Sequence, residues 1–362
     1  MTTEISRRSW QGWQAFCDTP YLQRPDIKTV PELADMEEDA LAEYQQLRIR
    51  YHTFMTPVET AFLKEIRQVV QLVRATNPVG GYAARNAVVI DGAPTVGKTT
   101  AINHVARAVD RRSRRLNGDR TATGAHRIPT ARIGLSGSPS IKAFSRSIAT
   151  FLGVPERLNL TTERWTAAAM GALEKAETEL LIVDDLHCLN AGSRDGQALT
   201  DHLKRILDDF AGTCVYAGVD LADKGLYDTS GRRTRGRIDQ TARRWTLVRG
   251  DRISLSDAEG RKEWKSLVAT LESQLALCNH EYGYLASHAD LLYECTTGSV
   301  GSLTELLKRA AAIAIVSGAE RIDESVINQT PLDIGSVAAR RAAAGEQRAR
   351  KGKAAKGKRR GA

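Results

Sequence analysis

The pattern of apolar and polar positions divides the chain into short apolar runs separated by longer amphipathic stretches. The apolar runs predict four buried strands, at Ala87–Ile90, Ala131–Leu135, Leu180–Val183 and Thr213–Gly218. Helical spacing predicts helices at Val58–Val73, Ala101–Ala106, Ile141–Leu152, Glu163–Glu177 and 199–210. Because strands that alternate with helices form parallel sheets, the centre of the chain is predicted to be an α/β domain, a parallel sheet sandwiched by helices.

The two ends of this α/β region differ in pattern from its centre. Thr56 to Glu59 has the sequence of a capping box with proline at the first helical position, so the first helix is expected to begin there. From Asp257 onward the apolar spacing is helical, which predicts a small all-helical subdomain over residues 257–330. Residues 1–55 contain an aromatic cluster (Trp10, Trp13, Phe16 and Tyr21) and an acidic segment (Glu32–Glu43), and we interpret them as an appendage that docks on the core or on a partner.

The stretch Gly92–Thr100 carries the phosphate-binding motif Gly-x-x-x-x-Gly-Lys-Thr between a predicted strand and a predicted helix. In that geometry, backbone N–H groups and the helix N-terminus surround an anion. Lys98 is expected to reach the β- and γ-phosphates, and the Thr99 hydroxyl is expected to bind Mg²⁺. The predicted nucleotide-binding residues are Gly92, Ala93, Pro94, Thr95, Val96, Gly97, Lys98, Thr99 and Thr100.

A second motif follows the third predicted strand, where Asp184 and Asp185 end the apolar run. Open α/β sheets bind ligands at the carboxyl ends of their strands, so both carboxylates are expected beside the phosphate-binding loop. Asp184 is predicted to hold Mg²⁺ through water, and Asp185 is predicted to activate the attacking water. His187 either contacts the γ-phosphate region or has a local structural role.

Charge is distributed unevenly along the chain. The net charge is +9, and residues 337–362 alone contain ten Lys and Arg against one Glu. This stretch cannot bury a core, so we expect a disordered tail that attracts nucleic acid or keeps the protein soluble.

The arginine-rich segment Arg111–Arg127 is expected to be an exposed loop. In a second such segment, Gly231–Arg252, either Arg243 or Arg244 is the candidate arginine finger for a neighbouring subunit, and the other arginines face DNA phosphates or solvent.

The remaining composition excludes several classes of protein. No apolar run approaches the roughly 20 residues of a membrane span, and the N-terminus lacks the apolar core of a signal peptide, so a cytoplasmic protein with no membrane partner is expected. The five cysteines are scattered without metal-binding spacing, which favours free thiols. The guanine-recognition motif Asn-Lys-x-Asp is absent from the sequence, so ATP is expected rather than GTP.

These motifs resemble those of the AAA+ P-loop NTPases and, within them, the TniB/TnsC-like ATPases of transposons. The resemblance covers about Thr56 to Asn328. Gly92–Thr99 and Leu181–His187 indicate the superfamily, and Ala217–Val219, Gln240–Trp245 and Gly298–Leu303 suggest the subfamily. The resemblance implies a AAA+ nucleotide-binding core at residues 56–256, a helical lid at 257–330 and a basic tail at 331–362.

The resemblance also implies a function. Such proteins bind ATP and Mg²⁺, assemble on duplex DNA as homo-oligomeric rings or filaments, and recruit a transposase to target DNA, with a target-selection factor as a second partner. Asp185 stands where the superfamily usually has Glu, which predicts slow ATP hydrolysis. Two alternatives stay open: a replication initiator or helicase loader of the same superfamily, and a signalling or defence scaffold that binds nucleotide with little hydrolysis.

Overall fold

The structure is a computed structural model that describes residues 6, 8–78, 84–135, 140–156, 159–186, 194–224, 226 and 244–338, without the side chains of residues 194 and 195. The chain divides into two compact units. Unit 1 contains Met1–Pro20 and Glu59–Asp251, and unit 2 contains Tyr21–Val58 and Arg252–Ala362. Among the helices that the structure describes, none is long and apolar enough to cross a lipid bilayer.

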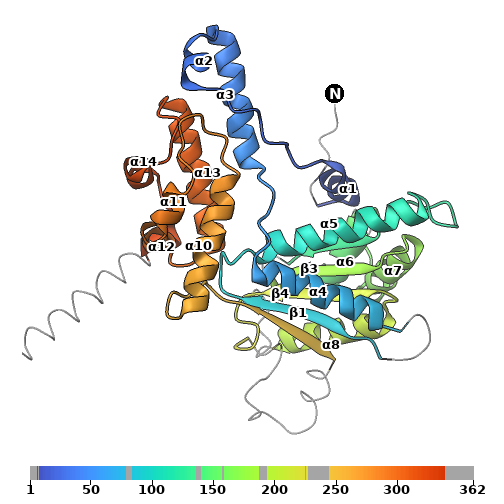
Figure 1. Ribbon diagram of the computed structural model, residues 1–362. Coiled ribbons are helices and arrows are strands. Elements are labelled where there is room, and N and C mark those ends of the chain that lie inside the picture. Colours follow the sequence, from blue (N-terminus) through green and yellow to red (C-terminus); the bar gives the residue numbers. More distant parts are fainter. Residues whose placement is uncertain are drawn as a thin grey trace, which may run out of the picture. The chain divides into compact units, whose positions relative to one another are not determined.

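Unit 1 is built on a five-stranded parallel sheet (Figure 1). Its strands are β1 (Ala87–Gly92), β2 (Thr130–Gly134), β3 (Leu180–Asp184), β4 (Thr213–Gly218) and β5 (Trp245–Gly250), in the order β2-β3-β4-β1-β5. β3 and β4 are buried along their whole length, as parallel strands covered on both faces are. Asp91 of β1 lies opposite Gly218 of β4, and Gly92 lies opposite Gly250 of β5, so these strands end at the same edge of the sheet.

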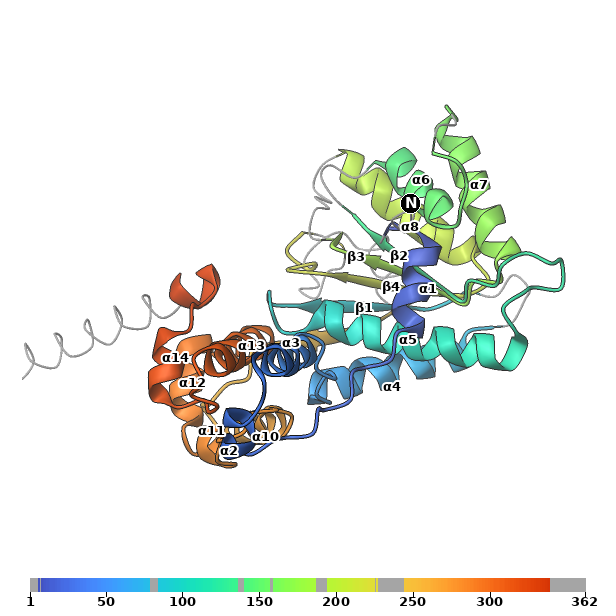
Figure 2. The ribbon, with the colours of Figure 1, turned by 90° about the horizontal axis from the view of Figure 1, so that it is seen from above.

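Helices cover both faces of this sheet. They are α4 (Ala61–Thr76), α5 (Lys98–Asn117), α6 (Ile141–Phe151), α7 (Thr162–Lys175) and α8 (Arg194–Asp209). Val215 of β4 lines an apolar cavity with Ile66 of α4 and Ile102 of α5. The next residue, Tyr216, donates its hydroxyl to the Leu203 carbonyl oxygen of α8 at 3.1 Å. Because successive strand residues point to opposite faces, α4 and α5 cover one face and α8 covers the other (Figures 1 and 2).

A short N-terminal helix, α1 (Trp10–Asp18), packs on α5 within unit 1 (Figure 2). Trp13 is buried and donates its indole N–H to Thr130 Oγ1 at 2.6 Å. Arg107 of α5 donates from Nε to the Cys17 carbonyl oxygen at 3.1 Å. Residues 1–55, predicted to form one appendage, are therefore divided: α1 belongs to unit 1, and the chain after Pro20 belongs to unit 2.

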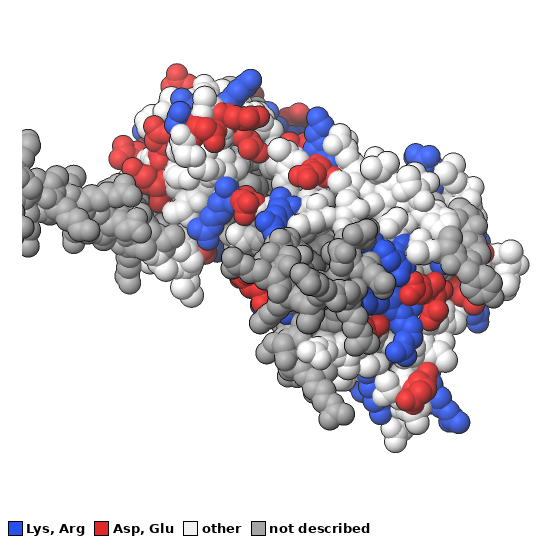
Figure 3. Space-filling view, turned by 90° about the horizontal axis from the view of Figure 1, so that it is seen from below, with Lys and Arg blue, Asp and Glu red and all other residues white. Residues whose placement is uncertain are grey.

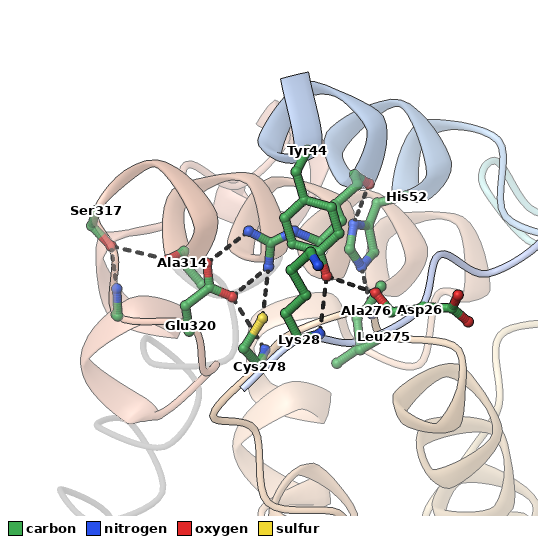
Figure 4. Close-up of polar contacts among 12 residues, drawn as sticks. Asp26, Lys28, Tyr44, His52, Leu275, Ala276, Cys278, Ala314, Ser317 and Glu320 are labelled. Carbon is green, nitrogen blue, oxygen red and sulfur yellow. Dashed lines mark hydrogen bonds and ion pairs between the residues drawn. The ribbon is translucent and has the colours of Figure 1, made fainter. Parts of the chain in front are cut away.

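Unit 2 is all-helical in its described part. Its helices are α2 (Val30–Ala34), α3 (Glu38–Thr53), α10 (Ala258–Ser273), α11 (Tyr284–Ser287), α12 (Ala289–Thr296), α13 (Val300–Val316) and α14 (Glu324–Gln329). α3 packs against α13. Figure 4 shows Tyr44 and His52 of α3 beside Cys278 and Glu320. These contacts join an N-terminal segment to the predicted lid helices in a single core.

Two local predictions at helix ends are wrong. The predicted capping box at Thr56–Glu59 does not start a helix, because α4 begins at Ala61 and the Thr60 side chain accepts the capping hydrogen bond. Arg111–Arg127 is not one exposed loop, because α5 continues to Asn117 before a glycine ends it. An ion pair one helical turn apart, between Asp110 and Arg114 at 2.7 Å, supports this continuation.

Other predictions at this level are confirmed or lie outside the described residues. The four predicted strands are present, and β5 is a fifth strand that the apolar pattern did not predict. The four described cysteines are free thiols, as predicted. Most of the predicted disordered tail, residues 339–362, lies outside the residues that the structure describes.

Candidate nucleotide-binding site

The loop between β1 and α5 is shaped by two glycines. A Cβ atom at Gly92 would lie 2.4 Å from the Gly250 carbonyl oxygen of β5, so a larger residue would push the two strands apart. Gly97 has a φ of +94°, in the left-handed region that favours glycine. Directly after it, α5 begins at Lys98 and runs for 20 residues. The unpaired N–H groups and positive dipole end of this helix therefore open on the loop.

Lys98 reaches back across this loop. Its ammonium donates to the Gly92 carbonyl oxygen at 2.6 Å and to the Ala93 carbonyl oxygen at 2.7 Å. Burial lowers the pKa of Lys98 from its ordinary value, and the carboxylates of Asp184 and Asp91 oppose this shift. Phosphate oxygens are charged and form stronger hydrogen bonds than carbonyl oxygens, so they can replace these two acceptors.

Thr99 faces the end of β3. Its hydroxyl donates to Asp184 Oδ2 at 3.1 Å, although the two residues are 85 positions apart in the chain. The Asp184 side chain is 3% exposed, and its Oδ1 accepts the Asp185 N–H at 2.9 Å. The structure therefore brings Lys98, Thr99 and Asp184 together at one edge of the sheet.

The donor set of Thr99 and Asp184 fits Mg²⁺. This ion prefers oxygen ligands and is usually held by one or two protein groups together with phosphate oxygens and water. Within the described parts of the chain, no group of three or more His, Cys, Asp or Glu side chains is arranged to hold a metal ion. A divalent cation at Thr99 and Asp184 would therefore take further ligands from the nucleotide and from water.

Asp185 lies on the same edge in an unusual backbone conformation. Its φ is +62°, a region that residues with a Cβ enter at a cost, and Asp and Asn enter it more readily than most others. A Cβ atom built on Gly134 of β2 would lie 4.0 Å from Asp185 Oδ2. The carboxylate is therefore placed beside the carboxyl end of β2, next to the strand that carries Asp184.

The sequence motifs did not identify Arg132, which also reaches this site. Its Nη2 forms an ion pair with Asp184 Oδ2 at 2.7 Å, and its side chain is 26% exposed. Arg132 lies in β2 between the buried residues Ala131 and Ile133. The sequence did contain a signal for Arg132, namely a charged residue inside a predicted buried strand. Such a charge requires a partner.

The remaining predicted site residues are distributed differently. Arg244 directly precedes β5, whereas the phosphate-binding loop follows the opposite end of the neighbouring strand β1. Its guanidinium forms an ion pair with Asp208 and donates from Nε to the Arg85 carbonyl oxygen at 3.2 Å. Arg244 is thus not brought to the nucleotide site of its own chain. Arg243 and His187 lie outside the described residues.

A parallel sheet in this order, with a glycine-bounded loop after β1 and an aspartate at the end of β3, defines the fold of an AAA+ P-loop ATPase. The Orc1 protein of Aeropyrum pernix in complex with DNA is similar in structure, with a TM-score of 0.53 and 15% identity over 77% of this chain. The match covers 65% of that Orc1 chain. The Orc2 protein of the same organism, solved as ADPNP–ADP complexes, has a TM-score of 0.53 and 14% identity, covering 76% of this chain and 68% of that one.

A narrower identification comes from the sequence family. Residues 64–241 match the family model described as bacterial TniB protein. This match confirms, over those residues, the resemblance to the TniB family of AAA+ ATPases. None of the curated proteins matches the chain.

Proposed function

We propose that the protein is an ATP-dependent DNA-binding AAA+ ATPase that assembles on duplex DNA and recruits a transposase to target DNA. The observation that carries the nucleotide part is the hydrogen bond from Thr99 Oγ1 to Asp184 Oδ2 at 3.1 Å, next in sequence to Lys98, whose ammonium folds back on the phosphate-binding loop. The TniB match over residues 64–241 supports the role in transposition.

Each side chain of the site has a proposed role in ATP hydrolysis. The backbone N–H groups of Gly92–Thr100 and the Lys98 ammonium bind the phosphates. Thr99 and Asp184 would hold Mg²⁺, which would supply positive charge to neutralise the phosphate oxygens. Asp185 accepts the proton of the attacking water. Because its side chain is one methylene shorter than the usual Glu, we expect slow turnover.

The charge distribution supports a DNA partner. On the face shown in Figure 3, the described Lys and Arg side chains are interspersed with Asp and Glu side chains. Residues 337–362 carry the excess positive charge in sequence, with ten basic side chains and one acidic one. Arg111, Arg112 and Arg115 of α5 are exposed and offer further contacts to phosphates.

Sedimentation velocity of fluorescent duplex DNA with the full chain tests the proposal. We expect a large complex with ATP and a small one with ADP at the same salt concentration. Lys98→Ala should abolish the difference because it removes the phosphate-binding ammonium. Lys204→Ala should preserve it, because it removes only a partly exposed lysine that pairs with Asp201. DNA that sediments identically with either nucleotide would count against a nucleotide-gated assembly.

The tail is tested in the same assay. Removing residues 337–362 should weaken DNA binding and flatten its salt dependence, by about 0.9 in log–log slope for each DNA phosphate that the tail neutralises. An unchanged slope would assign the tail a role other than DNA binding.

A second candidate function, a replication initiator or helicase loader, is favoured by the structural likeness to the Orc proteins. The two functions differ in the enzyme that joins the DNA-bound complex. Pull-down of a transposase with the ATP-bound complex supports the first proposal, and pull-down of a replicative helicase instead supports the second.

A further inference from the structure

Asp184 is held by the chain at both carboxylate oxygens. Oδ2 accepts from Thr99 Oγ1 at 3.1 Å and from Arg132 Nη2 at 2.7 Å. Oδ1 accepts the Asp185 N–H at 2.9 Å. The Arg132 guanidinium and the Thr99 hydroxyl, which is proposed to bind the metal, therefore donate to the same carboxylate oxygen of Asp184.

The position of Arg132 follows from the register of the sheet. Arg132 lies opposite Ile182, and Gly134 lies opposite Asp184, so Arg132 and Asp184 are on the same face of adjacent strands, two residues apart in register. A long side chain on this edge strand can run along the sheet to the carboxylate. Since residue 134 is glycine, no side chain stands between them.

The Arg132 guanidinium is a permanent charge that is incompletely satisfied. Arginine side chains carry their positive charge at all times in proteins. Its Nε is buried without a hydrogen-bond partner among the described residues, while Nη2 binds Asp184. A group with an unused donor and partial exposure can change partners at little cost, unlike a fully paired buried arginine.

We propose that Arg132 is a positioning residue that serves as an internal counter-ion of Asp184 and thereby sets the affinity of the nucleotide site for its divalent cation. This inference rests on the proposed function, because it takes the ATP site as the place where the cation binds. The guanidinium orients the carboxylate. It also opposes an approaching cation, by charge repulsion and by occupying Oδ2.

The expected effect is large enough to measure. A unit charge close to a divalent cation in a hydrated site changes the affinity by about tenfold. The probe is Mn²⁺, titrated into the full chain with saturating ADP and followed by loss of the free-ion electron paramagnetic resonance signal. This readout does not require hydrolysis.

Neutral and charged variants separate charge from packing. Arg132→Gln and Arg132→Met both remove the positive charge but introduce side chains of different shape. If one variant fails to fold, the other still tests the role of the charge. Both should lower the dissociation constant for Mn²⁺ about tenfold, and Arg132→Lys should stay near the wild-type value. Arg127→Gln is the matched control, because Arg127 pairs with Glu177 instead of Asp184.

The outcomes distinguish the two proposals. A tenfold tighter Mn²⁺ complex in the neutral variants supports the role of Arg132. An unchanged or weaker complex in folded neutral variants overturns that role and leaves the nucleotide site in place. If the wild-type chain binds no Mn²⁺ beyond that bound by ADP alone, the site assignment itself fails and the inference fails with it.

Discussion

Arg48 of α3 and Glu320, 272 positions later, form an ion pair in which the two side chains are 0% and 4% exposed. Arg48 donates from Nη2 to Glu320 Oε1 at 2.8 Å, and the Cys278 N–H donates to Oε2 at 3.1 Å. The guanidinium also lies over the Tyr44 ring, 4.4 Å from its centre. Figure 4 shows the side chains of Tyr44, Cys278 and Glu320 close to one another. A buried ion pair thus fixes the N-terminal helix α3 to the C-terminal part of unit 2.

Glu320→Gln should strongly destabilise unit 2. The substitution preserves size but leaves the buried Arg48 guanidinium without a counter-charge, which typically costs about 3–5 kcal/mol. Hydrogen exchange of peptides from α3 should therefore become much faster. Glu305→Gln is the control, because Glu305 pairs with Lys308 while about half exposed, and such pairs contribute less than about 1 kcal/mol. Equal protection of α3 in the two variants would contradict a stabilising role for the pair.

His52 should make the stability of unit 2 depend on pH. Its Nε2 accepts the Ala276 N–H at 3.0 Å, and its Nδ1 lies 2.7 Å from the Arg48 carbonyl oxygen, an arrangement that requires a neutral ring. Burial lowers the pKa of His52 from 6.5 to about 4. Between these values the unfolded chain binds a proton that the folded chain does not. The free energy of unfolding should therefore fall by up to about 3 kcal/mol as the pH falls from 6.5 to 4.

The measurement needs a probe within unit 2, and Trp264 is the one tryptophan that this part of the sequence contains. Urea denaturation followed by the fluorine resonance of 5-fluorotryptophan at Trp264 reports on this unit alone. Burial also lowers the pKa of His280 in the same unit, so a His52→Asn variant is required to isolate the His52 contribution. The variant should be less stable at pH 7 and lose less stability on acidification. If the free energy of unfolding falls equally with pH in the variant and in the wild type, the pH dependence does not come from His52.

Local signals in the sequence were sufficient for the centre of the fold. The motif at Gly92–Thr99 predicted β1, the loop and α5, since each glycine and the helix start have a local backbone reason. β5 was not predicted because Trp245–Gly250 mixes buried and exposed positions within an arginine-rich segment and so lacks the continuous apolar run of the other strands. The helix start at Ala61 was misplaced because two threonines, Thr56 and Thr60, both offer capping chemistry.

Pairs of residues far apart in the sequence were only partly predictable, both in the site and in unit 2. Thr99 and Asp184 could be paired because parallel strands end at a common edge, which is a general property of the fold. Arg132 and Asp184 depend on the register of two adjacent strands, and Arg48 and Glu320 depend on how the helices of unit 2 pack. Neither relationship leaves a periodic pattern in the sequence, because each forms only through the packing of the folded chain.

Asp185→Asn should preserve ATP binding and slow hydrolysis by about 10²–10⁴-fold, the range for loss of a general base. Asn tolerates the φ of +62° at this position as well as Asp does, so the loop should keep its shape. Single-turnover release of phosphate and equilibrium binding of a fluorescent ATP analogue separate the two effects. Asp185→Glu, which retains a carboxylate with a longer reach, is the matched variant and should hydrolyse ATP at least as fast as wild type. If Asp185→Asn hydrolyses ATP at the wild-type rate, Asp185 is not the general base.

Arg244→Ala should reduce ATP hydrolysis by about 10³-fold in assembled protein, because an arginine finger acts on the site of a neighbouring subunit. The position of Arg244 before β5, at the opposite end of the sheet from the phosphate-binding loop, prevents action on its own site in cis. Mixing Arg244→Ala with Asp185→Asn tests this directly, since the second variant supplies intact Arg244 to the functional sites of the first. The mixture should hydrolyse ATP faster than either variant alone.

Loss of the ion pair between Arg244 and Asp208 must be separated from loss of the finger. Asp208→Asn removes the pair and retains Arg244, so it should hydrolyse ATP at the wild-type rate or faster, because the guanidinium is released to reach a neighbour. If Asp208→Asn is as slow as Arg244→Ala, the pair stabilises the fold and Arg244 is not the finger. If Asp208→Asn is active and the mixture does not regain ATP hydrolysis, the finger is a different arginine. Arg243→Ala in the same mixing assay then tests whether the finger is the adjacent residue.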